Sequence, residues 1–263
     1  MKFLEFNEDG DHTIVLVHGG NVAGWMWGEQ VPALTDFHVL VPDLPGFGAS
    51  NDEPWISQAD SADRLAELIA AKARGGAAHV VGLSLGAGVG LHLAARHPES
   101  VASLLISSTS VVRPSRAAQA AGRAMLAVWD RRWFWIALAR GYGLPADSVD
   151  LFVETGLGIR RDTALAVFAE VTRGLTSDLF ASVRAPTLAV AGGRDPAAVK
   201  SLGPIRGQVE GALLAIAPGM HHQWNIENVD LFNAMVVEWI TRSTVADGLV
   251  NTSAVEGRQS QRE

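Results

Sequence analysis

Cysteine is absent from the 263-residue chain, which excludes disulfide bonds, thiolate nucleophiles and Cys-ligated metal sites. The sequence also lacks an apolar run of about 18 residues, the minimum length of a helix that spans a bilayer. Residues 1–12 contain one Lys and four acidic residues and have no apolar core, so they do not resemble a signal peptide. We therefore expect a cytoplasmic protein with no membrane span.

Basic residues are scarcer than acidic ones, with 21 Lys+Arg against 28 Asp+Glu and a net charge of −7. This balance disfavours nucleic acid as a partner, although one or two arginines could still hold a small anionic substrate. Charged residues make up 19% of the chain and hydrophobic residues 48%, so most of the chain is expected to fold. The length fits one large domain, or one domain with an insertion.

Short apolar runs rich in β-branched residues alternate with helical patterns over most of the chain. The runs lie at residues 13–17, 38–41, 79–81, 101–107, 187–191 and 212–216, with helical patterns such as 61–74 and 86–96 between them. Runs that are apolar on both faces are typical of parallel strands covered by helices on each side. The alternation predicts an α/β fold with a doubly wound, mostly parallel sheet.

The alternation stops near residue 111 and resumes near residue 184. We interpret residues 111–183 as an inserted helical cap on a core formed by residues 1–110 and 184–243. An apolar segment of the predicted cap carries Trp129 and Trp133. This segment either packs on the core or lines an apolar pocket over the active site, and both readings remain open. Residues 244–263 lose periodicity and are expected to form a flexible tail.

The segment Gly82-Leu83-Ser84-Leu85-Gly86 matches the pattern G-x-S-x-G. An apolar strand leads into it and a helix of small residues follows, which is the context in which this pattern presents a nucleophilic serine. The sharp turn strains the serine backbone and requires small residues two positions away on either side. It also puts the Leu85 amide at a helix N-terminus, where the amide can stabilise negative charge.

A glycine pair follows the first long strand, in His18-Gly19-Gly20. The backbone amide of Gly20 could form an oxyanion hole with that of Leu85, or the glycines could serve only a tight turn. We expect His18 to be a structural hydrogen-bonding residue rather than a catalytic one.

Two later loops supply an acid and a base. Asp195 follows the strand at 187–191, and it could be a helix N-cap or the acid that orients a catalytic histidine. His221 and His222 follow the next strand, where an imidazole could accept the proton of Ser84. The chain order Ser, Asp, His is that of one of the convergent triad families.

Together these residues resemble the α/β-hydrolase superfamily over roughly residues 12–110 and 184–242. The matching segments, in chain order, are HGG at 18–20, PDLPGFGAS at 42–50, GLSLG at 82–86, HPE at 97–99, GGRD at 192–195, and the final His followed five residues later by Glu227. The resemblance implies that Ser84 is the nucleophile, Asp195 the acid and His222 the base. His221 then stands where the family usually has Gly.

The sequence departs from the family pattern at its start and in the first loop. Only one short strand, at residues 2–6, fits before the first long strand, where the family usually has a hairpin. The loop HGGNVAGW lacks the HGxGPG form of the C–C bond hydrolases, which weakens that interpretation. Ser84 stands where dehalogenases and epoxide hydrolases carry Asp, and this argues against both of those activities.

The favoured function is hydrolysis of a carboxylic ester of an apolar or aromatic small molecule through an acyl-enzyme, with no cofactor and no metal site. The alternatives are a lactone or C–C bond hydrolase with the same triad, and a small-molecule receptor that retains the triad. Aromatic residues near a site often belong to the core, but several are candidates for the substrate pocket. The pocket candidates are Trp25, Trp27, Trp129, Trp133, His221 and Trp224. The sequence does not indicate an oligomeric state.

Overall fold

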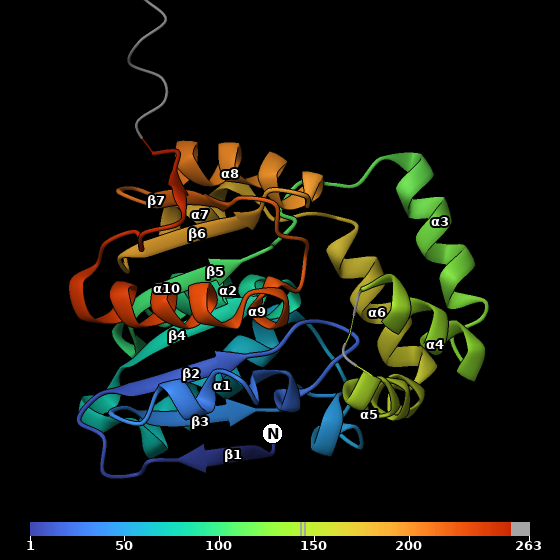
Figure 1. Ribbon diagram of the computed structural model, residues 1–263, viewed down its shortest axis with the longest axis horizontal. Helices are drawn as coiled ribbons and strands as arrows, with labels where there is room; N and C mark the ends of the chain where they lie inside the picture. The colour runs from blue at the N-terminus through green and yellow to red at the C-terminus, as the bar shows by residue number, and fades with distance from the viewer. Residues whose placement is uncertain (143, 145, 254–263) are drawn as a thin grey trace, which may run out of the picture.

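The computed structural model describes residues 1–142, 144 and 146–253, and among these an eight-stranded sheet forms the centre of the molecule (Figure 1). Its order is β1-β3-β2-β4-β5-β6-β7-β8. The strands are β1 (Phe3–Phe6), β2 (Thr13–Val17), β3 (His38–Pro42), β4 (Ala78–Leu83), β5 (Val101–Ser107), β6 (Thr187–Gly192), β7 (Leu213–Ala217) and β8 (Val250–Asn251). The edge strands β1 and β8 pair antiparallel and the inner strands pair parallel, which confirms the predicted fold class.

Helices cover both faces of this sheet, as a doubly wound fold requires. One layer consists of α1, α2, α7 and α8, each in contact with the next, and α10 lies on the opposite face (Figure 1). Their bounds are α1 (Gln58–Lys72), α2 (Leu85–Arg96), α7 (Ser177–Ser182), α8 (Pro196–Gln208), α9 (Trp224–Glu227) and α10 (Val229–Arg242).

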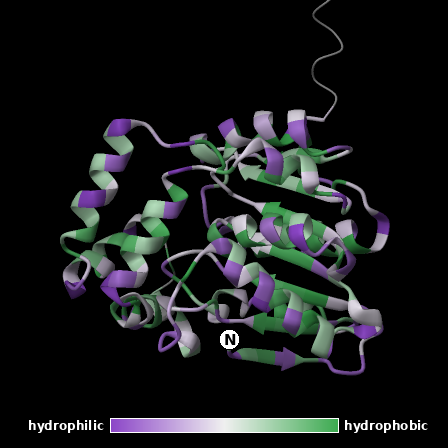
Figure 2. Cartoon of the chain, turned by 180° about the vertical axis from the view of Figure 1, so that it is seen from behind, coloured by the Kyte–Doolittle hydropathy of each residue, from purple (hydrophilic) through white to green (hydrophobic). Residues whose placement is uncertain are grey.

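The inner strands form the apolar centre of the core. All five residues of β2 and all five of β3 are buried, and Figure 2 shows the strands in green between more mixed helices. Both faces of each strand are covered, so continuous apolar runs rather than alternation mark these strands in the sequence. Within the described residues, no helix is both long and apolar enough to traverse a bilayer.

Between β5 and β6 the chain leaves the sheet, and in its described part α3 to α6 lie beside the carboxyl ends of the strands (Figure 1). These cap helices are α3 (Arg116–Leu126), α4 (Arg132–Gly141), α5 (Ala146–Gly158) and α6 (Arg161–Val171). A small aromatic core joins α4 to α5 and to the turn before α4, and in it the buried Trp135 contacts Trp129 and Phe152. The next helix, α7, falls within the predicted cap range but packs against α2 and α8 of the core layer.

Residues 244–253 differ from the expected flexible tail. Val250 and Asn251 pair antiparallel with β7, and the backbone N–H of Thr252 donates to the carbonyl of Leu214 over 2.8 Å. The reason is that β7 would otherwise leave an unpaired sheet edge, which even a two-residue strand can cover. The remainder of the predicted tail, residues 254–263, lies outside the described residues.

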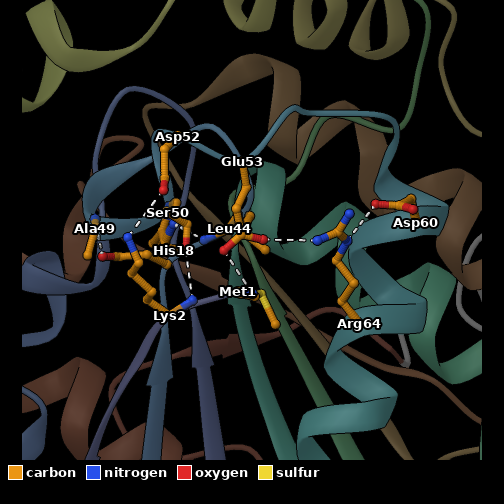
Figure 3. Close-up of polar contacts among 11 residues, drawn as sticks. Met1, Lys2, His18, Leu44, Ala49, Ser50, Asp52, Glu53, Asp60 and Arg64 are labelled. Atoms are coloured by element: carbon orange, nitrogen blue, oxygen red, sulfur yellow. Dashed lines mark hydrogen bonds and ion pairs between the residues drawn. The ribbon is translucent and has the colours of Figure 1, made fainter.

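The loop after β3, residues 43–53, is fixed by ion pairs to elements on either side (Figure 3). The amino group of Met1 lies 2.9 Å from Glu53 Oε1. Arg64 of α1 contacts both Glu53 and Asp60 at 2.9 Å. These contacts hold the loop under the cap helices, where it reaches the site described next.

Candidate active site

Ser84 stands at the sharp turn between β4 and α2. Its backbone has φ 55° and ψ −109°, a combination that residues other than glycine rarely adopt. A side chain at position 82 would collide with the backbone of Gly86, and one at position 86 would collide with the carbonyl of Val17. The two glycines of the G-x-S-x-G pattern therefore allow the turn to pack against its own helix and against β2.

Side chains from two other loops meet Ser84. His222 Nε2 lies 2.9 Å from Ser84 Oγ, and His222 Nδ1 lies 2.6 Å from Asp195 Oδ2. The three residues follow β4, β6 and β7, and parallel strands end at the same edge of the sheet. In this arrangement the imidazole can accept the serine proton while the carboxylate binds Nδ1–H.

Asp195 contacts two partners at once. Its Oδ1 accepts a hydrogen bond from the backbone N–H of Ala198 at the start of α8, over 3.2 Å, while its Oδ2 faces His222. Burial disfavours the charged carboxylate, but the hydrogen bonds from His222 and the α8 amides outweigh burial and hold the pKa of Asp195 below its usual value. The helix-cap contact and the histidine contact, alternatives in the sequence, are thus both present.

His221 is held away from Ser84 by Glu227. Its Nδ1 lies 2.9 Å from Glu227 Oε1, and its backbone N–H donates to Glu227 Oε2 over 2.7 Å. The side chain of His221 is 58% exposed. Glu227 therefore fixes the turn that precedes His222, and His222 is the histidine that contacts the serine.

The backbone amides of Gly20 and Leu85 border the same space as Ser84. Neither amide has a hydrogen-bond acceptor among residues 1–142, 144 and 146–253. Two unpaired N–H groups beside a nucleophile are available to an oxygen of a bound ligand.

The buried His18 precedes Gly20 and is held by hydrogen bonds at both ring nitrogens; Figure 3 shows it beside Leu44. His18 Nδ1 donates to the carbonyl of Gly19 over 2.7 Å, and Nε2 accepts from the backbone N–H of Leu44 over 2.9 Å. Complete burial lowers the pKa of His18, so the ring is neutral and Nε2 is free to accept. This confirms the structural role expected for His18.

A cavity of about 260 Å³ opens from Ser84 toward the cap helices. Apolar side chains from core and cap form most of its wall, as is usual for a small-molecule pocket. They include Phe47, Leu83, Met125, Leu126, Trp129, Ile159, Val167, Phe168, Val171 and Leu175.

Of the six pocket candidates, Trp129 lines this cavity and the other five do not. Trp27 and Trp224 are fully buried against Phe232 of α10. The indole N–H of Trp224 donates to Ser107 Oγ over 2.9 Å. These two tryptophans belong to the core, so their assignment to the pocket was wrong.

The other three candidates also point elsewhere. The indole N–H of Trp25 donates to Thr155 of α5 over 2.9 Å, which joins the first loop to the cap. Trp133 of α4 is 61% exposed. His221 and Glu227 line a different pocket from the one at Ser84 Oγ. Their proximity in sequence to site residues did not determine the direction of their side chains.

Several residues that line the cavity are not among the candidates predicted from the sequence. Phe47 lies inside the matched segment PDLPGFGAS, which could have indicated it. Gln58, Tyr142, Phe168 and Glu170 carry no motif, and only the packing of the cap on the core brings them to the cavity.

Comparisons with known proteins agree with this fold. The alpha/beta hydrolase fold family model matches residues 12–152. An AB hydrolase superfamily protein of Gibberella zeae is 32% identical over 94% of this chain and 86% of its own length. A pimeloyl-[acyl-carrier protein] methyl ester esterase of Chromobacterium violaceum is 42% identical over 98 residues, 37% of each chain. The crystal structure of a hydrolase from Pseudomonas aeruginosa PA01 superimposes with a TM-score of 0.76 and 28% identity, covering 91% of this chain and 93% of that one.

Proposed function

Because this chain belongs to the alpha/beta hydrolase fold family, we propose that it is a serine hydrolase that cleaves carboxylic esters of apolar or aromatic small molecules. The observation that carries the proposal is the line of contacts from Asp195 through His222 to Ser84, at 2.6 and 2.9 Å, at the end of an apolar cavity. The local similarity to a methyl ester esterase supports an ester rather than another acyl compound.

The proposed reaction begins with attack of Ser84 Oγ on the ester carbonyl while His222 Nε2 accepts the serine proton. Asp195 holds Nδ1–H and stabilises the imidazolium. The amides of Gly20 and Leu85 stabilise the tetrahedral oxyanion, each by about 3 kcal/mol. His222 then protonates the leaving alcohol. A water molecule activated by the same histidine releases the acid from the acyl-enzyme.

The test is a screen of 4-nitrophenyl esters with the Ser84→Ala protein as its blank. We expect this substitution to reduce turnover about a thousandfold or more, because it removes the nucleophile and leaves the surrounding fold in place. Near-normal hydrolysis by Ser84→Ala would overturn the assignment.

A fluorophosphonate probe separates an active hydrolase from a binding protein that merely retains the three residues. We expect covalent labelling of Ser84 in the native protein and none in Ser84→Ala. An unlabelled native protein would favour the receptor alternative.

A further inference from the structure

The cavity wall carries two polar residues, in contact with each other, whose side chains the proposed ester hydrolysis does not use. Glu170 lies on α6 of the cap and Gln58 is the first residue of α1 in the core, and both line the cavity. They are 112 positions apart and are joined by a hydrogen bond from the Gln58 backbone N–H to Glu170 Oε1, over 2.9 Å. Together they make a polar patch, Glu170 with Gln58, in a wall that is mostly apolar.

The carboxamide of Gln58 has unused hydrogen-bonding capacity. Gln58 is 4% exposed, and its side-chain amide has no hydrogen-bond partner in the part of the chain that the structure describes. A buried amide without partners is costly, so such a group at a cavity wall suits a ligand that completes it. Its Oε1 lies against Gly88, where any Cβ would collide with it.

The carboxylate of Glu170 accepts one hydrogen bond on each oxygen and could accept more. Its Oε1 accepts from Gln58 and its Oε2 accepts from the indole N–H of Trp55 over 3.2 Å, which leaves lone pairs on both oxygens. Burial raises the pKa of Glu170, although these two donors and the charge of the exposed Arg173 oppose the rise. A donor or cation in the cavity would stabilise the ionised carboxylate, and an anion would be repelled by it.

No basic side chain compensates for this carboxylate within the cavity. Among the described lining residues there is no Lys and no Arg, and the ionisable side chains are Glu170, His222 and Tyr142. A substrate carboxylate would therefore meet one negative charge and no fixed positive one.

The position of the patch relative to Ser84 indicates which part of an ester would reach it. Gly88 lies one turn beyond Ser84 on α2, about 6 Å along the helix axis. The leaving alcohol must lie near His222, which protonates it and whose side chain is 37% exposed. An acyl chain that extends away from His222 can pass Gly88 and reach Gln58 and Glu170, since all three line the same cavity.

We propose that Glu170 and Gln58 form a polar subsite that selects esters whose acyl chain ends in a hydrogen-bond donor, above all an ammonium group, and rejects acyl chains that end in a carboxylate. This subsite rests on the proposed ester hydrolysis at Ser84.

The test compares 4-nitrophenyl esters of hexanoic, 6-hydroxyhexanoic and 6-aminohexanoic acids with the mono-4-nitrophenyl ester of adipic acid. In the native protein kcat/KM should be highest for the amino ester and lowest for the adipate ester. In Glu170→Gln the ratio of the amino to the adipate ester should fall at least about tenfold, because a charged hydrogen bond becomes a neutral one. Ratios within each protein cancel any change in overall activity.

The matched control is Trp55→Phe. Trp55 is not among the cavity-lining residues, and this change removes one contact of Glu170 while leaving its carboxylate in place. The amino-to-adipate ratio should fall much less than in Glu170→Gln, because the loss of this donor raises the pKa of Glu170 but leaves its carboxyl group in place. An equal fall in Trp55→Phe and Glu170→Gln would mean that attachment of the cap, and not a subsite, sets the preference.

A second variant keeps the test informative if Glu170→Gln does not fold. Gln58→Met retains the backbone N–H that binds Glu170 and removes the carboxamide, so it should lower the preference for the hydroxy ester over the hexanoate. A native protein with equal rates on all four esters, or with a preference for the adipate, would overturn the subsite. The 4-nitrophenyl acetate ester is too short to reach it, so failure to hydrolyse acetate as well would instead overturn the proposed function.

Discussion

Ser84 combines two properties that oppose each other. Its hydroxyl lies within 2.9 Å of His222 Nε2, but its φ of 55° belongs to a region that favours glycine. Such backbone strain costs about 1–3 kcal/mol and persists where the surrounding packing enforces it. Here Gly82 and Gly86 allow close packing of the turn against its own helix and β2, and the Ser84 N–H donates to the carbonyl of Ser107 over 2.9 Å.

The strain predicts that Ser84→Gly is more stable than Ser84→Ala. Both variants lose the hydroxyl, but only glycine relieves the backbone, and this gain exceeds the larger chain entropy that glycine adds to the unfolded state. We expect a difference on the order of 1 kcal/mol, or about 3 °C in melting temperature. Equal melting temperatures in thermal unfolding would show that the turn stores no strain.

The adjacent histidines allow a paired test of the proposed base. His222→Ala should abolish most ester hydrolysis, because no other imidazole contacts Ser84 within the described residues. His221→Ala should retain activity within a few-fold, since His221 contacts Glu227 at the outer surface. Rates for both variants should be measured in one assay. A dead His221→Ala with an active His222→Ala would reverse the assignment.

At the scale of elements, α1 and α2 are joined by an ion pair between Asp63 and Arg96, with N–O distances of 2.8 and 2.7 Å. His97 Nε2 adds a third contact to Asp63 at 2.7 Å. The hydrogen bonds from the Arg96 guanidinium are the largest cause that lowers the pKa of Asp63, to about 2. A carboxylate with a lowered pKa stabilises the folded state above its unfolded pKa and ceases to do so as pH falls through 2.

In Asp63→Asn the free energy of unfolding should therefore fall less steeply than in the native protein as the pH drops from about 4 to about 2. Asp63 is 41% exposed, so screening by solvent limits the effect to about 1 kcal/mol or less. Urea unfolding of the native protein and the variant at several pH values measures it. The two proteins should differ most above pH 4 and converge near pH 2. A constant difference across this range would exclude the ion pair as the cause.

The sequence predicts these elements well where burial is continuous. The runs at 13–17 and 101–107 coincide with β2 and β5, because strands covered on both faces are mostly apolar along their length. β8 was not predicted, since two residues are too few to show a period. The six residues of α7 were grouped with the cap because helical pattern alone does not tell which layer a helix joins.

At the scale of the whole molecule, the cavity exists only where the cap meets the core. Ser84, Asp195 and His222 could be found from sequence because each follows a strand and carries a recognisable motif. Glu170 could not, because its place depends on a contact with Gln58 across 112 positions. Trp27 and Trp224 lie near site residues in the sequence, but in the fold both indole rings pack against Phe232 of α10. Position in the sequence alone therefore assigned them wrongly to the pocket.

The mainly apolar wall predicts a dependence on acyl length in 4-nitrophenyl esters of unbranched acids. Each methylene that enters the cavity should add about 0.8 kcal/mol, or roughly fourfold in kcat/KM. The rise should end when the chain fills the volume of about 260 Å³. Steady-state rates from acetate to octanoate, corrected with the Ser84→Ala blank, provide the measurement. A flat profile would mean that the acyl chain does not occupy this cavity.

The double contact of Asp195 has an evolutionary consequence. One oxygen caps α8 and the other faces His222, so a substitution there weakens a helix as well as the proposed triad. Within the described part of the chain, the Ser84 side chain makes no helix-capping bond, and the His222 ring contacts Asp195 and Ser84 instead of a helix end. A lineage that drifted from catalysis toward passive ligand binding would therefore lose the serine or the histidine first, and the aspartate would persist as a relic of the ancestral enzyme.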